Sequence, residues 1–202
     1  MTQYRITIAN TEAGFSNALE LTERIAETMG LTRKEGMRLR LLAEEMLSMV
    51  KSIAGEFSAE FWIDHEGRDC RLHLAAKSEL DYAKRRELLS VSTTGKNTAR
   101  LGIMDKVRGI FEAGLFGIEE GFALQAEYGV GVPGFGMIGT LDDGVSGMLY
   151  SWSMQKYKQD VHEDTDAADE LEKSIIANIA DEVNVGVRRD GVELTVNKNF
   201  RR

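Results

Sequence analysis

Two adjacent glutamates in residues 41–50, "LLAEEMLSMV", are the side chains of this chain best placed to do chemistry. If the segment is a helix with about 100° between successive residues, Glu44 points to solvent, and Glu45 lies about 40° from Met49 at the border of an apolar stripe. The residues of that stripe are Leu42, Met46, Met49 and Ile53. We therefore predict that Glu45 lines a pocket at the border of the core.

A second group of polar residues stands before a predicted helix in residues 92–104, "STTGKNTARLGIM". Free backbone N–H groups at a helix start, hydroxyl donors and one lysine would suit a phosphate. The candidate anion-binding residues are Ser92, Thr94, Gly95, Lys96 and Asn97, with Asn97 as the expected N-cap. The segment is not a Walker loop, because Ser90 and Asn97 replace residues that this motif requires. A capped loop between two helices explains the same residues equally well.

Seven glycines fall within residues 129–147, and this Gly-rich stretch has two interpretations. It could cradle phosphates or form a mobile lid over a pocket. A flexible or bulged hairpin is the interpretation we favour, because no strand followed by a helix surrounds the glycines as a phosphate-binding fingerprint requires.

Length and charge exclude several classes of protein. A chain of 202 residues without a linker or repeat predicts a single domain over residues 1–202. The net charge of −8 disfavours nucleic acid as a partner, since an acidic chain repels phosphate backbones. One cysteine, Cys70, permits no internal disulfide, and no apolar run approaches the roughly 20 residues that cross a bilayer. We expect a cytoplasmic protein without a membrane partner.

Metal binding is not expected from the ligand set. The three histidines lie far apart in the sequence, and only His65 and His73 could meet, across a hairpin. One cysteine and no histidine pair at ligand spacing predict no zinc site. Cys70 falls within a predicted strand without a basic neighbour, which is typical of a small core residue.

Alternation of apolar and polar residues predicts several strands. They are residues 4–9, a hairpin of 57–63 and 70–74 around "HEGRD", residues 148–154, and a final hairpin of 183–187 and 192–196 around Asp190-Gly191. Helical spacing predicts a helix that stops at Gly30 and a second that begins at the capping box Thr32–Glu35 and ends near Gly55. Further helices are expected over residues 80–90, 98–115 and 164–181.

This order of elements predicts an α+β fold. Two or more antiparallel hairpins interleaved with helices favour a two-layer α/β sandwich, with a mixed, largely antiparallel sheet and the helices on one face.

The element order and two motifs resemble the histidine-kinase-like ATPase superfamily, which includes gyrase, Hsp90, histidine kinases and mismatch-repair ATPases, and within it the anti-sigma-factor serine kinases. "LLAEEMLSMV" is similar to that family's Leu-x-x-x-Glu-Glu-x-x-x-Asn helix, with Glu45 at the position of the general base. Residues 175–200 are similar to the family's ending, a helix, "DEV" and a hairpin that closes on Lys-x-Phe. Bacterial proteins of this type also contain a "TGKN" loop before a "GIM" helix.

The resemblance implies a regulatory protein that binds ATP or ADP, that acts on a sigma-factor or anti-anti-sigma type of partner, and that can form a homodimer. The chain departs from the family at three places. Met49 replaces the asparagine that holds magnesium, and a thioether is a poor ligand for that hard cation. Both glycine boxes are missing, at "AAKSELD" and at "HEDTDAADELEKS". The expected activity is therefore weak or absent serine/threonine kinase or ATPase catalysis, without a metal site.

Two alternatives remain open from the sequence. One is a non-catalytic relative that keeps the fold and binds a partner protein. The other is an unrelated α+β protein that binds a small anion through residues 92–97.

Overall fold

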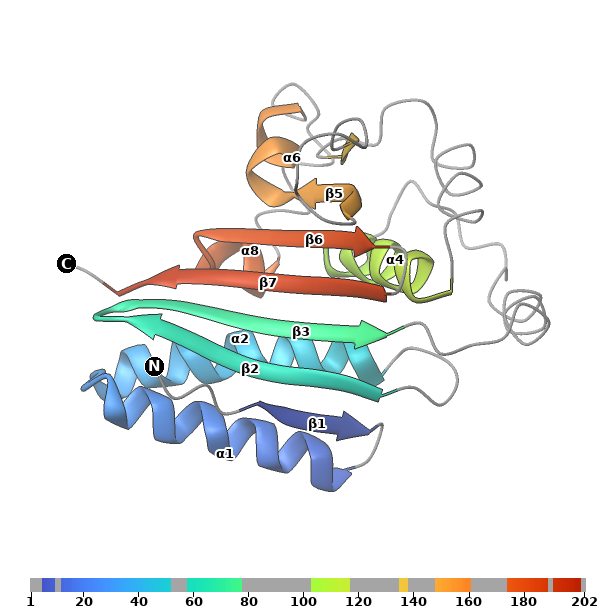
Figure 1. The fold of residues 1–202 in the computed structure, drawn as a ribbon. Coiled ribbons are helices and arrows are strands. Elements are labelled where there is room, and N and C mark those ends of the chain that lie inside the picture. The colour runs from blue at the N-terminus through green and yellow to red at the C-terminus, as the bar shows by residue number, and fades with distance from the viewer. Residues whose placement is uncertain are drawn as a thin grey trace.

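The computed structural model describes residues 5–9, 12–51, 58–77, 103–116, 135–137, 148–160, 174–188 and 191–200. Its sheet has seven strands: β1 (Ile6–Ala9), β2 (Ser58–Glu66), β3 (Asp69–Lys77), β4 (Phe135–Met137), β5 (Met148–Ser153), β6 (Glu182–Arg188) and β7 (Gly191–Asn199). The helices are α1 (Glu12–Thr28), α2 (Arg33–Lys51), α4 (Ile103–Phe116), α6 (Met154–Asp160) and α8 (Ile175–Ile179). The predicted α+β class is confirmed (Figure 1).

The sheet consists of two meanders that meet at its centre. The strand order is β1-β2-β3-β7-β6-β5-β4, so β1 to β3 form one half and β4 to β7 the other. The last strand, β7, pairs with β3 from Asp69↔Asn199 to Lys77↔Gly191 and joins the halves. Every pairing between these strands is antiparallel, so the parallel component of the predicted mixed sheet is not found among them.

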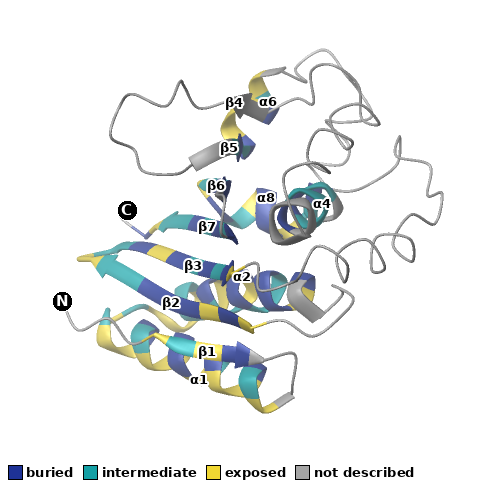
Figure 2. Ribbon diagram, turned by 45° about the vertical axis from the view of Figure 1, so that its right-hand side comes forward, coloured by how far each residue is buried: buried dark blue, intermediate teal, exposed yellow. Residues whose placement is uncertain are grey.

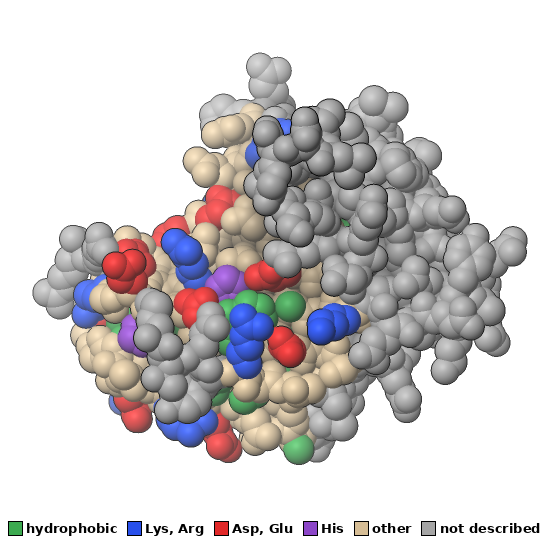
Figure 3. Space-filling view, viewed as in Figure 1, with side chains coloured by type: hydrophobic (Ala, Val, Ile, Leu, Met, Phe, Trp, Pro, Cys, Tyr) green, Lys and Arg blue, Asp and Glu red, His purple; other side chains and the backbone are tan. Residues whose placement is uncertain are grey.

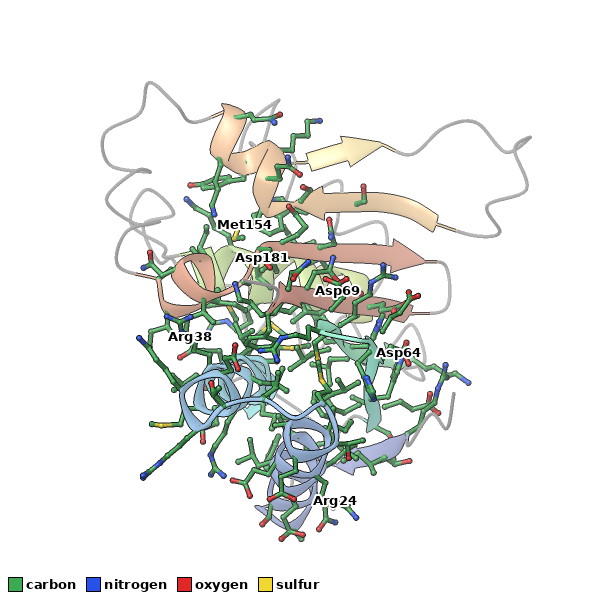
Figure 4. All side chains as sticks on the ribbon, turned by 90° about the vertical axis from the view of Figure 1, so that its left-hand side faces the viewer. Arg24, Arg38, Asp64, Asp69, Met154 and Asp181 are labelled. Carbon is green, nitrogen blue, oxygen red and sulfur yellow. The ribbon has the colours of Figure 1, made fainter. Side chains whose placement is uncertain are left out.

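The described helices cover one face of the sheet, as the sequence predicts (Figures 1 and 4). Helices α1 and α2 turn their buried positions toward the sheet and their exposed positions outward (Figure 2). Alternate residues of the central strands, including Leu72, Leu74, Leu194 and Val196, are fully buried against this helical layer. The intervening residues lie on the opposite face of the sheet, which carries polar side chains.

The start of α2 forms as its capping box predicts. The Glu35 carboxylate accepts hydrogen bonds from the Thr32 backbone N–H at 2.8 Å and from the Thr32 hydroxyl at 2.7 Å. The preceding helix ends at Gly30, whose φ of 63° is the left-handed conformation that glycine adopts without strain. The Leu31 N–H returns to the Ala26 carbonyl at 3.0 Å and completes this end of the helix.

Two predicted elements differ from the structure. The strand expected to run through Met154 ends at Ser153, and Met154 begins α6. Ser153 caps this turn, because its hydroxyl accepts from the Lys156 N–H at 3.2 Å. The helix predicted over residues 164–181 is not continuous: Ser174 is extended, with φ −81° and ψ 121°, and its side chain accepts from the Ala177 N–H to start the short helix α8.

Some predicted segments lie outside the described residues. They are the helix at 80–90, the loop 92–97 and the first residues of the predicted helix at 98–115. Within the Gly-rich stretch, residues 135–137 form β4 and pair with β5, from Phe135↔Trp152 to Met137↔Tyr150. The other residues of the stretch lie outside the described residues, so the choice between a lid and a hairpin stays a prediction.

Candidate functional site

The described residues of the apolar stripe of α2 are buried as predicted, whereas Ile53 lies outside the described residues. Leu42, Met46 and Met49 are all buried, with Met49 only 5% exposed. On one edge, Arg40 contacts Glu44 at 2.8 Å and also Glu23 of α1. This edge therefore faces α1, and Glu45 lies on the other side of the apolar stripe. Figure 4 shows α2 lying between α1 and α8.

The Glu45 carboxyl is partly buried at the border of the core, where the sequence places it. Within the part of the chain that the structure describes, it makes no hydrogen bond or ion pair. Burial raises the pKa of the Glu45 carboxyl above its ordinary value, because desolvation disfavours the charged form, and the neighbouring Glu44 carboxylate raises it further. A carboxyl in this state is suited to accept a proton.

Met49 lies one helical turn after Glu45 and is buried. Its burial confirms that this position belongs to the core. A soft thioether at that place does not fit magnesium, which prefers oxygen ligands in octahedral geometry. Among the described residues, no group of three or more histidine, cysteine, aspartate or glutamate side chains could hold a metal ion.

The candidate anion-binding loop lies outside the described residues. Ser92, Thr94, Gly95, Lys96 and Asn97 all lie outside them, so the structure does not place this loop against Glu45.

The polar face of the sheet carries a second cluster, which sequence reasoning missed. His73 of β3 stacks on Trp62 of β2, with ring centroids 4.7 Å apart and an angle of 2° between the planes. His73 Nδ1 lies 3.0 Å from a Glu193 oxygen, and Trp62 Nε1 donates to Asp64 at 3.3 Å. The same Asp64 oxygen lies 3.4 Å from His73 Nε2. Strand alternation alone puts these positions on one face, but only the β3–β7 pairing brings Glu193 to His73.

His65 and His73 do not meet. The hairpin register pairs His65 with Cys70 and His73 with Trp62, which places the two histidines on opposite faces of the sheet. Cys70 is buried, as predicted, and burial together with the nearby Asp64 raises the pKa of its thiol to about 12. The reactive thiolate is therefore suppressed at neutral pH.

Comparisons with known proteins assign no family to this chain. Scans of protein-family models, of curated proteins and of solved structures found no match. Among the described helices, none is both long and apolar enough to cross a membrane.

Proposed function

We propose that this protein is a nucleotide-binding-type regulatory domain with the histidine-kinase-like ATPase fold, acting in the cytoplasm on a regulatory protein partner of the sigma-factor or anti-anti-sigma type. The observation that carries the proposal is the state of Glu45. Its carboxyl is partly buried at the border of the apolar stripe of α2 and has no partner among the described residues. The resemblance assigns the general base to this position.

Two features of the fold support the proposal. The described helices lie on one face of an antiparallel sheet, which is the layer order that the resemblance implies. The β6–β7 hairpin also follows α8, which is the order of elements that the resemblance implies for residues 175–200. Fold alone does not determine function, so the proposal depends on a ligand test.

Catalysis is weak or absent in this proposal. A general base beside a nucleotide needs a cation to offset the repulsion between its own charge and the phosphates, and Met49 cannot contribute a magnesium ligand. ATP or ADP is then the bound ligand, which residues 92–97 contact in this proposal, and nucleotide occupancy acts on partner binding rather than on turnover.

The melting temperature in the presence of nucleotide tests the proposal. A ligand at 100 times its dissociation constant stabilises the folded state by about 2.7 kcal/mol, which is readily measured. We expect ATP or ADP to raise the melting temperature whether or not magnesium is present. If nucleotide raises the melting temperature only when magnesium is present, the site binds the metal and the inference from Met49 is wrong. Stabilisation by inorganic anions but not by nucleotides would favour the unrelated anion-binding protein.

The buried Met49 also favours a second candidate function. An apolar side chain in place of the metal ligand is what a non-catalytic relative requires, since the position then contributes only to packing. In that case the folded chain shows no thermal response to any nucleotide and binds its protein partner without one.

A Glu45→Gln variant separates catalysis from binding. If the wild type hydrolyses ATP, we expect the variant to lose turnover and to retain its nucleotide-induced rise in melting temperature, because glutamine keeps the shape and loses the basicity. Glu44→Gln is the matched control, one residue away on the opposite edge of the helix. Equal turnover in wild type and Glu45→Gln would show that Glu45 is not the general base.

A further inference from the structure

The polar face of the sheet holds an ordered stack of planar groups. The guanidinium of Arg5 lies over the Trp62 ring, 4.3 Å from its centroid, and His73 stacks on the other side of that ring. Trp62 is therefore only 6% exposed, although it lies on the face of the sheet away from the described helices. Figure 3 shows this face with a histidine and hydrophobic side chains among acidic and basic ones.

Carboxylates surround the stack. Glu60 lies 3.4 Å from Arg5, Asp64 contacts both Trp62 and His73, and Glu193 contacts His73. Figure 4 shows Asp64 on the side of the sheet away from the helices. A cation beside an aromatic face and within reach of several carboxylates is stabilised by both, so this surface is built to hold a guanidinium group.

Buried acceptors on the same face lack hydrogen bonds. Asn197 Oδ1 and Glu182 Oε2 are buried without a partner, and the two residues pair directly across β6 and β7. His73 Nε2 is also buried, and an Asp64 oxygen lies 3.4 Å from it. Buried acceptors normally have donors, so the Asn197 and Glu182 oxygens can accept hydrogen bonds that the described residues do not supply.

Arg5 is held loosely in its position. Its side chain and that of Glu60 are each about half exposed, 50% and 48%, and their contact is long. An exposed ion pair of this kind contributes little stability, so a better-placed guanidinium can displace Arg5.

We propose that the face of the sheet around Trp62 and His73 is a docking surface for an arginine-bearing segment of a partner protein, and that Arg5 occupies the guanidinium position in the free chain. Arginine suits the surface better than lysine does, because its planar group stacks on aromatic rings and its five N–H donors match several acceptors at once. The proposal does not depend on nucleotide binding, since the surface lies on the face of the sheet opposite α2.

The test uses three short synthetic peptides that differ only at two positions, which carry arginine, lysine or citrulline. Binding is followed by NMR through the indole N–H resonances of the two tryptophans, with Trp62→Phe to assign the Trp62 signal. We expect the arginine peptide alone to shift the Trp62 resonance and to saturate. The Trp152 resonance should not move, because Trp152 is buried in the core on the other face.

Variants of the surface residues test the competition. Arg5→Ala should bind the arginine peptide about three- to tenfold more tightly, since it removes the internal competitor. Asp64→Asn should bind it more weakly by a similar factor. Arg5→Lys keeps the charge and should give an intermediate affinity. This variant controls for any change that Arg5→Ala causes in the structure of β1. Arg24→Ala is the matched control, because Arg24 is exposed on α1, away from this face (Figure 4).

Several results would overturn the proposal. Equal binding of the lysine peptide would show general electrostatic attraction without guanidinium recognition. If Arg5→Ala and Asp64→Asn are folded by circular dichroism and bind the arginine peptide with unchanged affinity, the peptide does not bind this surface. Self-association of Arg5→Ala without peptide, measured by light scattering, would identify a second copy of the chain as the occupant in place of a partner protein.

Discussion

Glu45 is a residue whose charge weakens the fold that carries it. Its carboxyl loses hydration at the edge of α2 and gains no ion pair or hydrogen bond among the described residues. A glutamine would fill the same space without the charge. A carboxyl that loses hydration without a partner among the described residues is a candidate for function, because active sites often keep such groups.

The raised pKa of Glu45 predicts how the stability of the fold depends on pH. The pKa of Glu45 is higher in the folded chain than in the unfolded chain, so the folded chain holds this proton more tightly. The group therefore stabilises the fold below its ordinary pKa, and that stabilisation is lost as the pH rises through the folded-state pKa. We expect Glu45→Gln to raise the melting temperature at pH 7, with the gain shrinking toward zero near pH 4.

Glu44→Gln is the control for this measurement. Glu44 forms an exposed ion pair with Arg40, so its loss should change stability by no more than about 1 kcal/mol. A Glu45→Gln variant that melts below the wild type at pH 7 would mean that the Glu45 carboxylate is stabilised by a partner outside the described residues.

At the scale of elements, one arginine links three segments that are distant in sequence. Arg68, in the turn between β2 and β3, contacts the Glu35 carboxylate at 2.6 Å and donates to the Phe200 carbonyl at 2.9 Å. The Phe200 N–H donates in return to the Arg68 carbonyl at 2.9 Å. The start of α2, the hairpin turn and the end of β7 are thus held together, and Glu35 is the acceptor common to Thr32 and Arg68.

This linkage predicts how the protein responds to acid. Hydrogen bonds from the backbone and hydroxyl of Thr32, and then from Arg68, lower the pKa of Glu35 from 4.5 to about 2. The unfolded chain takes up this proton first as the pH falls, so the contribution of Glu35 is complete above about pH 4.5 and is lost as the pH falls toward 2. We expect Glu35→Gln to lower the melting temperature at pH 7 and to converge with the wild type near pH 2.

Thermal melts from pH 7 to pH 2 measure this difference, with Glu27→Gln, an exposed glutamate of α1, as the control. A constant difference between Glu35→Gln and the wild type across that range would show that the charge of Glu35 contributes nothing.

Two glycines give a matched pair of predictions at the element scale. A Cβ on Gly191 would lie 2.2 Å from the Ala76 carbonyl oxygen, so Gly191→Ala must push β7 away from β3. We expect a loss of roughly 1–3 kcal/mol, as for other overpacked sites. A Cβ on Gly36 would meet Ala26 Cβ at an ordinary 3.6 Å, and Gly36→Ala should stabilise α2 by roughly 0.5–1 kcal/mol. Urea unfolding measures both, and a stable Gly191→Ala would show that the strands separate easily.

The sequence predicts local elements well because their causes are local. The capping box at Thr32 and the stop at Gly30 each depend on residues within one turn of the chain. The burial of Glu45 at a core border follows from the apolar period of α2 alone. Two features have no local cause. One is the pairing of β3 with β7, which brings Glu193 to His73. The other is the start of α6 at Met154, where Ser153 caps a helix although the alternating pattern favours a strand.

At the scale of the molecule, the order of strands makes the two halves of the sheet interdependent. Among the described strands, only the β3–β7 pairing joins the meander of β1 to β3 with that of β4 to β7. Leu194 on β7 is fully buried at this junction and pairs with Leu74 of β3. We expect Leu194→Ala to lower the free energy of unfolding by roughly 2–5 kcal/mol in urea unfolding experiments. Thr195→Ala, on the polar face, is the adjacent control and should cost far less.

The two tryptophans allow each half to be followed separately. Trp62 lies on β2 in the first meander, and Trp152 lies on β5 in the second. Because the long β3–β7 pairing couples the halves, Trp62→Phe and Trp152→Phe should each give a urea transition by fluorescence that coincides with the loss of circular dichroism in the same variant. In either single-tryptophan background, Leu194→Ala should shift the fluorescence transition and the circular dichroism transition to the same lower urea concentration. If the Trp62 and Trp152 signals then separate into two transitions, the halves are independent folding units and the β3–β7 junction is too weak to couple them.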